Sequence, residues 1–386
     1  MRRVLLALGC LAIAAALLAY ALGSSHRRAH SARAVPVAPA PGAVAPRPGW
    51  LGLNGNTSNY LGPIDTFSRA GVVFDRNLEL EAGSLPGEGA PGTPAAELPG
   101  RLAEEHLLGM SPVAVIDYRG YGRPGYEFRE DPEFPRRRSA AEAAAGRQTI
   151  AGYVAGFIRS AAAIRALAGA RDPGTEVRFE VMNEPWGNTT PAYDAGEYAE
   201  VLAALLPAAA AAGIPARDIY VAATGAACTA GSCRANGWVP ALYRAEPALR
   251  QEIAGWYLHP YGPPTGVDEL DDGGIQAVPL IRAGMVSGRE NLIVSEVGFC
   301  SRDVNNPSGS PAGSDCHGAP VLSSEAAAAS LQRTLEEALV YHREGWLVAL
   351  IVYSRNDGGW AMQLPGGALT PSGRVLLRFA SAQAPG

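Results

Sequence analysis

The sequence of 386 residues contains no lysine, so all 32 of its basic residues are arginine. Schiff-base aldolases, enzymes that use pyridoxal phosphate and nucleotide binders with a Walker A loop all depend on a lysine amine. The missing lysine therefore excludes these three chemistries. The formal net charge is −5, and this mildly acidic balance argues against a nucleic-acid partner, which would need a basic face.

Histidine is also scarce, and a metal-dependent barrel hydrolase would need clustered His and Asp ligands. The six histidines are His26, His30, His106, His259, His317 and His342. They are scattered, and no H-x-H or H-x-x-x-H motif lies on an expected strand. We therefore expect neither a metal site nor a cofactor.

Cysteine is sparse as well, with Cys10 in an N-terminal apolar run and four others in two local pairs. Paired cysteines in an exported protein are typical of disulfides. We predict the pairs Cys228–Cys233 and Cys300–Cys316, each closing a loop. A metal site is the alternative, but no C-x-x-C motif or ligand-spaced histidine accompanies these cysteines.

Charged residues are absent from the run between Val4 and Gly23, which follows Arg2 and Arg3. The run is about as long as a membrane-spanning helix requires, and it ends in a small-x-small sequence like that of a cleavage site. Residues 1–23 are therefore interpreted as either a cleaved signal peptide or an N-terminal membrane anchor through residues 4–23. Either way we expect export, with the protein secreted or held on the outer side of a bacterial cytoplasmic membrane.

Residues 24–48 are rich in Ala, Pro, Ser and Arg, and we interpret them as a flexible linker. From residue 49 onward, short apolar runs alternate with Ala-rich helical stretches, which is typical of repeated β-α units. Eight such units predict a (β/α)₈ barrel of the TIM type, a single domain over residues 49–386. We expect a monomer with long strand-to-helix loops.

The expected strands are residues 50–55, 72–76, 113–118, 177–184, 219–224, 255–259, 292–296 and 346–354. The expected helices are residues 95–108, 139–167, 197–212, 239–249, 278–283 and 323–342. Three Pro- and Gly-rich segments, residues 82–99, 120–135 and 301–320, are interpreted as the long loops. Such loops lie on the catalytic face of a barrel and build its cleft.

Two glutamates close expected strands. Asn183-Glu184-Pro185 ends the fourth strand and Glu296 ends the seventh. Active sites of these barrels lie at the C-terminal ends of the strands, so both carboxyl groups should point into one cleft. Retaining hydrolysis of a glycosidic bond needs two carboxyl groups about 5–5.5 Å apart, one to protonate the leaving oxygen and one to attack the anomeric carbon.

Asn-Glu-Pro on the fourth strand and Glu-Val-Gly-Phe on the seventh resemble clan A of the retaining glycoside hydrolases. Within the clan, the cellulase-like family 5 and its relatives are the most similar. The resemblance covers the whole expected barrel in motif order. It implies that Glu184 is the acid/base, that Glu296 is the nucleophile and that Asn183 contacts the sugar 2-hydroxyl.

The same resemblance extends to five further positions. It implies that His259 lines the cleft and that Tyr261 donates to the nucleophile. It also implies that Trp360, and similarly Trp186, offer flat platforms for a sugar, and that Arg76 holds the nucleophile ionised. A structural role for His259 and a core position for Trp360 are the alternatives.

Glu180 shares the inward face of the fourth strand with Arg178 and Glu184. Because a buried Glu–Arg pair is more often structural than catalytic, we predict a structural pair between Glu180 and Arg178.

The resemblance as a whole implies a retaining glycosidase that cleaves β-glycosidic bonds of an oligo- or polysaccharide by double displacement. Two alternatives stay open. One is a barrel that binds a glycan without cleaving it, since fold alone does not give function. The other is a transglycosylase, in which a sugar hydroxyl intercepts the same covalent intermediate. The kind of sugar and the choice between endo and exo action are not determined by the sequence.

Overall fold

The computed structural model describes residues 49–55, 65–118, 140–185, 195–223, 235–249, 253–261, 275, 278–279, 291–302, 321–355, 358–364 and 367–383. The chain divides into two compact units, Met1–Pro41 and Gly42–Gly386, and all described residues belong to the second. Residues 1–48, with the expected signal peptide or anchor and linker, lie outside the described residues.

Eight parallel strands form a closed barrel in which each strand pairs with the next and the last returns to the first. They are β1 (Leu51–Asn54), β2 (Phe74–Glu81), β3 (Ser111–Asp117), β4 (Arg178–Val181), β5 (Ile219–Ala222), β6 (Gly255–Leu258), β7 (Asn291–Val297) and β8 (Ala349–Tyr353). The strands are mostly apolar and buried because helices cover the outside of the sheet while side chains fill its inside. The predicted (β/α)₈ barrel is confirmed.

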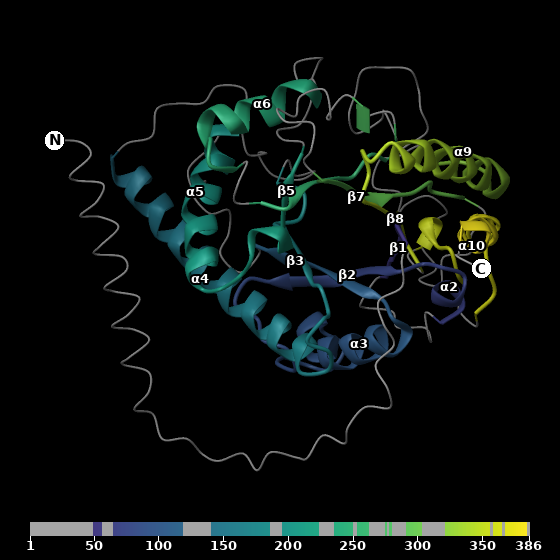
Figure 1. Cartoon of the computed structure of the whole chain (residues 1–386), viewed down its shortest axis with the longest axis horizontal. Coiled ribbons are helices and arrows are strands. Elements are labelled where there is room, and N and C mark those ends of the chain that lie inside the picture. Colours follow the sequence, from purple (N-terminus) through teal and green to yellow (C-terminus); the bar gives the residue numbers. More distant parts are fainter. Residues whose placement is uncertain are drawn as a thin grey trace, which may run out of the picture. The chain divides into compact units, whose positions relative to one another are not determined.

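The described helices surround this barrel (Figure 1). They are α2 (Asp65–Arg69), α3 (Pro94–Leu108), α4 (Ala140–Gly169), α5 (Ala195–Ala211), α6 (Ala235–Ala245), α9 (Ser324–Arg343) and α10 (Pro371–Gln383). Helix α3 shows how sequence sets their ends: the Thr93 side chain caps its first turn, Pro94 occupies the first position, and Gly109 at φ 65° ends it. The expected helix at residues 278–283 lies largely outside the described residues.

Helices α2 and α10 were not expected from the sequence. Helix α10 buries Val375, Leu376 and Phe379, a spacing of one and three residues that marks one face of a helix. The stretch is short and follows a Pro/Gly-rich segment, which conceals this periodicity.

Strand β2 differs most from expectation. The prediction ended it at Arg76, whereas it continues to Glu81, with an irregular register against β3 between Asp75 and Leu78. Arg76 therefore lies within a strand rather than at its end. The charged and polar residues around it interrupt the apolar run, and such an interruption is typical of a strand end.

Among the described residues, one helical stretch, Thr149–Gly169 of α4, is long and apolar enough to cross a membrane by length and composition. This stretch packs on the barrel. The Tyr153 hydroxyl donates to the carbonyl oxygen of Ile116 in β3 at 2.8 Å, and Phe157 packs edge-on against Phe179 of β4. We therefore interpret it as an outer-layer helix of the barrel.

Candidate active site

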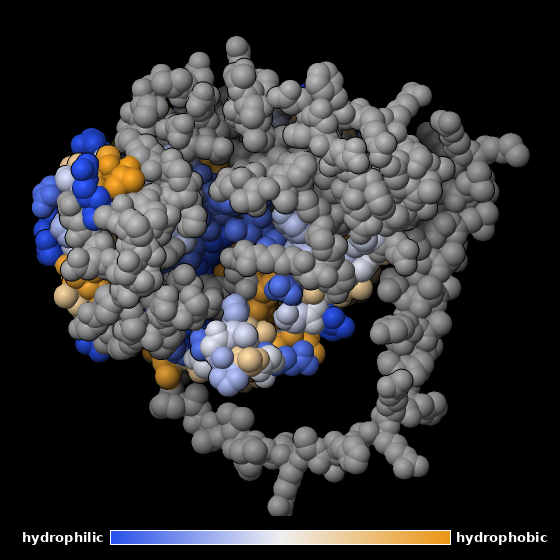
Figure 2. Space-filling model, turned by 180° about the vertical axis from the view of Figure 1, so that it is seen from behind, coloured by the Kyte–Doolittle hydropathy of each residue, from blue (hydrophilic) through white to orange (hydrophobic). Residues whose placement is uncertain are grey.

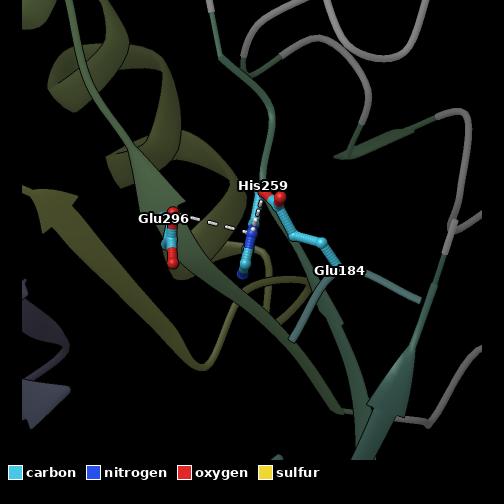
Figure 3. Close-up of side chains that lie close together, drawn as sticks. All are labelled: Glu184, His259 and Glu296. Carbon is cyan, nitrogen blue, oxygen red and sulfur yellow. Dashed lines mark hydrogen bonds and ion pairs between the residues drawn. The ribbon is translucent and has the colours of Figure 1, made fainter. Parts of the chain in front are cut away.

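Three titratable side chains converge at the C-terminal ends of the strands (Figure 3). Glu184 follows β4, His259 follows β6, and Glu296 is the next-to-last residue of β7. One carboxylate oxygen of each glutamate and one ring nitrogen of His259 all lie within 4.8 Å of one another. This separation is compatible with the ~5–5.5 Å that a retaining mechanism requires and is shorter than the spacing of inverting enzymes.

The chain leaves β4 through an uncommon backbone conformation. Met182 and Glu184 have positive φ values, 67° and 43°, which few residues other than glycine adopt. Such a conformation costs on the order of 1–3 kcal/mol and persists only where the surroundings hold it. The turn places the Glu184 side chain beside His259, so the strain is located where the carboxyl group is positioned.

Buried hydrogen bonds hold this turn in place. The Tyr257 hydroxyl donates to the carbonyl oxygen of Met182 at 2.8 Å, and the Tyr198 hydroxyl donates to that of Val181 at 2.9 Å. Burial raises the pKa of both tyrosines, so both hydroxyl groups keep their protons and remain donors. Tyr257 lies in β6 and Tyr198 lies in α5, and no sequence motif marks either residue.

Glu296 is surrounded by donors. Arg76 Nη1 donates to its Oε1, and the Tyr261 hydroxyl donates to its Oε2. Burial raises the pKa of Glu296, but the charges of His259 and Arg76 and the two hydrogen bonds outweigh that effect and hold it below its ordinary value. Burial and the charge of Glu296 raise the pKa of Tyr261 well above its ordinary value, so Tyr261 stays a donor. Glu296 is thus held as a carboxylate.

Glu184 is in a more open position. Its side chain is 20% exposed, against 9% for Glu296. The Nδ1 atom of His259 lies 2.9 Å from Glu184 Oε1 and 3.6 Å from Glu296 Oε2, and His259 Nε2 lies 3.1 Å from the hydroxyl of Ser295. His259 Nδ1 therefore lies beside both carboxyl groups, and Glu184 is the more exposed of the two.

Arg76 connects more groups than the sequence indicated. Its Nε donates to Glu180 Oε2 at 2.9 Å, and its Nη2 donates to Asn183 Oδ1 at 3.0 Å. Asn183 is thereby oriented beside Glu296. The predicted partner of Glu180 was wrong: Glu180 pairs with Arg76 across the barrel and not with Arg178 on its own strand.

The position of Arg178 along the barrel axis explains why it does not pair with Glu180. As the first residue of β4 it lies at the N-terminal end of the barrel. Its guanidinium group lies over the ring of Phe74 at 4.6 Å and reaches the exposed Glu176 at 3.4 Å. Arg178 and Glu180 share a face, as alternation requires, but their charged ends point to different layers.

Tyr261 packs edge-on against two aromatic rings. Its ring centroid lies 5.2 Å from that of Trp360 and 5.9 Å from that of Tyr353. Trp360 is only 3% exposed and also packs against Cys300. This burial favours a supporting role for Trp360 beneath Tyr261 over the predicted sugar platform. Tyr353, the half-buried last residue of β8, was not singled out in the sequence. Trp186 lies outside the described residues.

The glycine of Glu-Val-Gly-Phe has a packing reason. A Cβ atom on Gly298 would lie 2.3 Å from the carbonyl oxygen of Tyr353, so β7 and β8 approach closely only with glycine here. Cys228, Cys233 and Cys316 lie outside the described residues, so both disulfide pairings stay predictions.

Glu184, His259 and Glu296 could supply three ligand atoms to a metal ion. Both oxygens of Glu296 already accept hydrogen bonds from protein donors, and one of these donors is the cationic Arg76. A metal cation would compete with that charge and be repelled by it. We therefore interpret the three residues as an acid–base group.

No protein-family model and no curated protein matches the chain. Solved structures do. A family 39 glycoside hydrolase from Bacteroides cellulosilyticus WH2 is 16% identical, with a TM-score of 0.51 over 88% of this chain and 64% of that one. An endo-β-1,4-glucanase from Xanthomonas axonopodis pv. citri is 13% identical, with a TM-score of 0.51 over 87% of this chain and all of the other.

A broad-specificity endoglucanase from Clostridium acetobutylicum is also 13% identical, with a TM-score of 0.51 over 86% of this chain and 96% of that one. At such identities the likeness establishes the fold alone. The chain shares the barrel architecture of these glycoside hydrolases, and its own residues must carry any argument about activity.

Proposed function

We propose that this protein is a retaining glycoside hydrolase that cleaves β-glycosidic bonds by double displacement. The observation that carries the proposal is the pair Glu184 and Glu296, in which one carboxylate oxygen of each residue lies within 4.8 Å of the other at the C-terminal ends of the strands. The two groups also differ in the way the mechanism needs. Glu296 is buried and held ionised by donors, whereas Glu184 is partly open to solvent.

In the first step, a Glu296 oxygen attacks the anomeric carbon while the bond from that carbon to the leaving oxygen breaks. Glu184 gives its proton to the leaving oxygen, and a covalent glycosyl–Glu296 ester remains. In the second step Glu184 takes a proton from water, the resulting hydroxide attacks the anomeric carbon, and Glu296 leaves as a carboxylate. Two inversions give net retention.

Other residues orient this chemistry. Arg76 and Tyr261 fix the attacking oxygens of Glu296. Asn183 is oriented through its Oδ1 by Arg76, which leaves its amide N–H groups available for the 2-hydroxyl of a sugar. His259 contacts Glu184 through Nδ1, and the same atom lies 3.6 Å from Glu296 Oε2.

A β-glucan is the first substrate to test. Two of the solved structures with this fold are named as endoglucanases, one of them an endo-β-1,4-glucanase. The face shown in Figure 2 is hollowed near its centre, and the described residues visible in the hollow are hydrophilic. A polar hollow suits a ligand with many hydroxyl groups.

The test is hydrolysis of aryl β-glycosides by the full chain, followed by variants at the two glutamates. Glu296→Ala should abolish turnover, and azide should partly restore it by forming the α-glycosyl azide. Glu184→Ala should retain turnover only with good leaving groups, and azide should give the β-glycosyl azide. Glu176→Gln, an exposed carboxyl on the approach to β4, is the matched control and should leave activity unchanged.

A folded protein that binds glycans but cleaves none of a broad panel would support the non-catalytic alternative. Transfer of the sugar to an added acceptor, in place of release into water, would support the transglycosylase. Export rests on residues outside the described part of the chain and is proposed on the sequence alone.

A further inference from the structure

Glu180 is a buried carboxylate that the proposed mechanism does not use. It lies on β4, fully shielded from solvent, and faces Arg76 from across the barrel. Arg76 places its Nε on Glu180 and its Nη1 on Glu296. One guanidinium cation therefore forms ion pairs with two buried carboxylates. Only one of them, Glu296, takes part in the proposed reaction.

The second carboxylate is not simply a hydrogen-bond acceptor for Arg76. Its Oε1 atom is buried and has no hydrogen-bond partner among the described residues. Burying a charge with one oxygen unsatisfied destabilises a fold, and an apolar side chain would avoid that cost.

The groups around Glu180 leave Arg76 as its charge partner. On α5 and β6, Tyr198 and Tyr257 face it, and burial together with the Glu180 charge raises the pKa of Tyr257, so both phenols stay neutral. Glu296, in turn, faces Arg76, His259 and Tyr261, and Glu184 approaches the same His259 nitrogen. Arg76 is therefore the route by which the charge of Glu180 acts on Glu296.

We propose that Glu180 is a positioning residue that divides the charge of Arg76 between two carboxylates. By holding Nε, it fixes the guanidinium plane so that Nη1 meets Glu296 and Nη2 meets Asn183. By its negative charge, it reduces the pull of Arg76 on Glu296, which leaves Glu296 more basic and therefore a better nucleophile than an isolated Arg–Glu pair would. This inference rests on the proposed function, in which Glu296 attacks.

Glu180→Gln tests the charge, because glutamine keeps the size and an acceptor for Nε. Removing a nearby negative charge favours ionised Glu296, so the acidic limb of the pH profile of kcat/KM should move to lower pH by about 0.5–1 unit. The glycosylation step, measured in single turnovers, should slow. A purely structural role would scale the whole profile down and leave the limb where it is.

A second readout does not depend on turnover. The carboxyl carbon of Glu296 can be titrated by NMR in protein labelled with ¹³C-glutamate, with Glu296→Gln assigning the signal. Its pKa should fall in Glu180→Gln by the same amount as the kinetic limb. Glu176→Gln removes an exposed carboxyl close in sequence and should move neither the limb nor the signal.

These outcomes distinguish failure of the proposed function from failure of the inference about Glu180. If the wild type cleaves no glycoside, the proposed function fails, while the NMR titration still decides whether Glu180 acts on Glu296. An unmoved or rising Glu296 pKa in Glu180→Gln overturns the inference. Glu180→Met, which carries no unsatisfied amide, serves if the glutamine variant does not fold. Failure of both to fold, with Glu176→Gln folded, would assign the pair to stability and also overturn it.

Discussion

Two neighbouring residues of β2, Asp75 and Arg76, start two buried charge clusters on opposite sides of the same strand. Arg76 points into the barrel and meets Glu180 and Glu296. Asp75 points outward and meets Arg101 of α3 at 2.9 Å. Alternation along a strand sends neighbours to opposite faces, so one strand supplies both an inner cluster and an outer cluster. Each combines one arginine with at least two acidic side chains.

In the outer cluster, the acid Glu105 differs from Glu296 in its hydrogen bonding. Glu105 of α3 is 1% exposed and lies 4.0 Å from Arg101 Nε, and within the described residues neither of its oxygens has a hydrogen-bond partner. Burial and the charge of Asp75 raise the pKa of Glu105 well above its ordinary value. In the inner cluster the pKa of Glu296 is lowered. Similar residues in similar burial thus have pKa values shifted in opposite directions, and the donors that contact the carboxylate determine the direction.

The largest expected effect comes from removing the arginine of each cluster. Arg76→Gln and Arg101→Gln each leave a buried carboxylate without its counter-charge, which typically costs about 3–5 kcal/mol of stability. Only Arg76→Gln should also lower kcat/KM, by roughly 10²-fold or more, because Glu296 loses the donor that fixes it. Urea unfolding and kinetics per folded molecule measure the two effects. Equal loss of activity in both variants would contradict the distinction between the clusters.

A smaller effect is expected from paired tyrosine variants. Tyr257→Phe and Tyr153→Phe each remove a buried hydroxyl that donates to a backbone carbonyl at 2.8 Å. Both should lose about 1–3 kcal/mol of stability. Only Tyr257→Phe should reduce kcat, by roughly tenfold, because it loosens the turn that carries Glu184. A drop in KM alone, or an equal drop in kcat for Tyr153→Phe, would refute this role of Tyr257.

The wild-type pH profile checks the inner cluster directly. Because the folded-state pKa of Glu296 is lowered, this residue contributes stability that is present above its unfolded pKa, about 4.3. That stability is lost as the pH falls through the folded pKa. The acidic limb of kcat/KM should follow Glu296 and lie below about pH 4.3. A limb well above pH 5 would show that the donors around Glu296 do not hold it ionised.

The smallest effect is expected at Glu105, and its sign is opposite. A carboxyl whose pKa is raised in the folded state destabilises the protein as the pH rises from the unfolded pKa toward the folded one. Glu105→Gln removes this dependence and should raise the free energy of unfolding at pH 8 by about 1 kcal/mol, with less gain at pH 4. Glu336→Gln on the exposed face of α9 is the control. The same gain at both pH values would mean that the charge of Glu105 is not the cause.

Much of the fold could be predicted because parallel barrel strands are short, apolar and regularly spaced. All eight strands were found near their expected positions. The misplaced end of β2 has a specific cause: Asp75, Arg76 and Asn77 are polar, and polar residues usually end a buried strand. Here two buried ion clusters accommodate Asp75 and Arg76 on opposite sides, which no local pattern can reveal. Helix α10 was missed because its apolar face covers few residues.

In the candidate site, too, some residues could be predicted from local sequence and others could not. The glutamates, Asn183, His259 and Tyr261 could be found because each lies at or just after the end of a strand in a motif. Trp360 could be identified as a candidate, but its burial could not be predicted. That burial depends on Tyr261 and Cys300, which pack against it. Tyr257 and Glu180 lie inside strands, where a sequence gives no sign of their partners.

Residue content alone limits the chemistry available to this chain. The missing lysine argues against chemistry that depends on a lysine amine, whereas two glutamates at strand ends suit an acid and a nucleophile. The sequence also determined the barrel, because the strand and helix periods are local properties. The folded barrel brings Arg76 between Glu180 and Glu296, and it lowers the pKa of Glu296 while it raises that of Glu105. Those outcomes depend on which donors closure of the barrel brings within hydrogen-bond distance, and such contacts join residues more than a hundred positions apart.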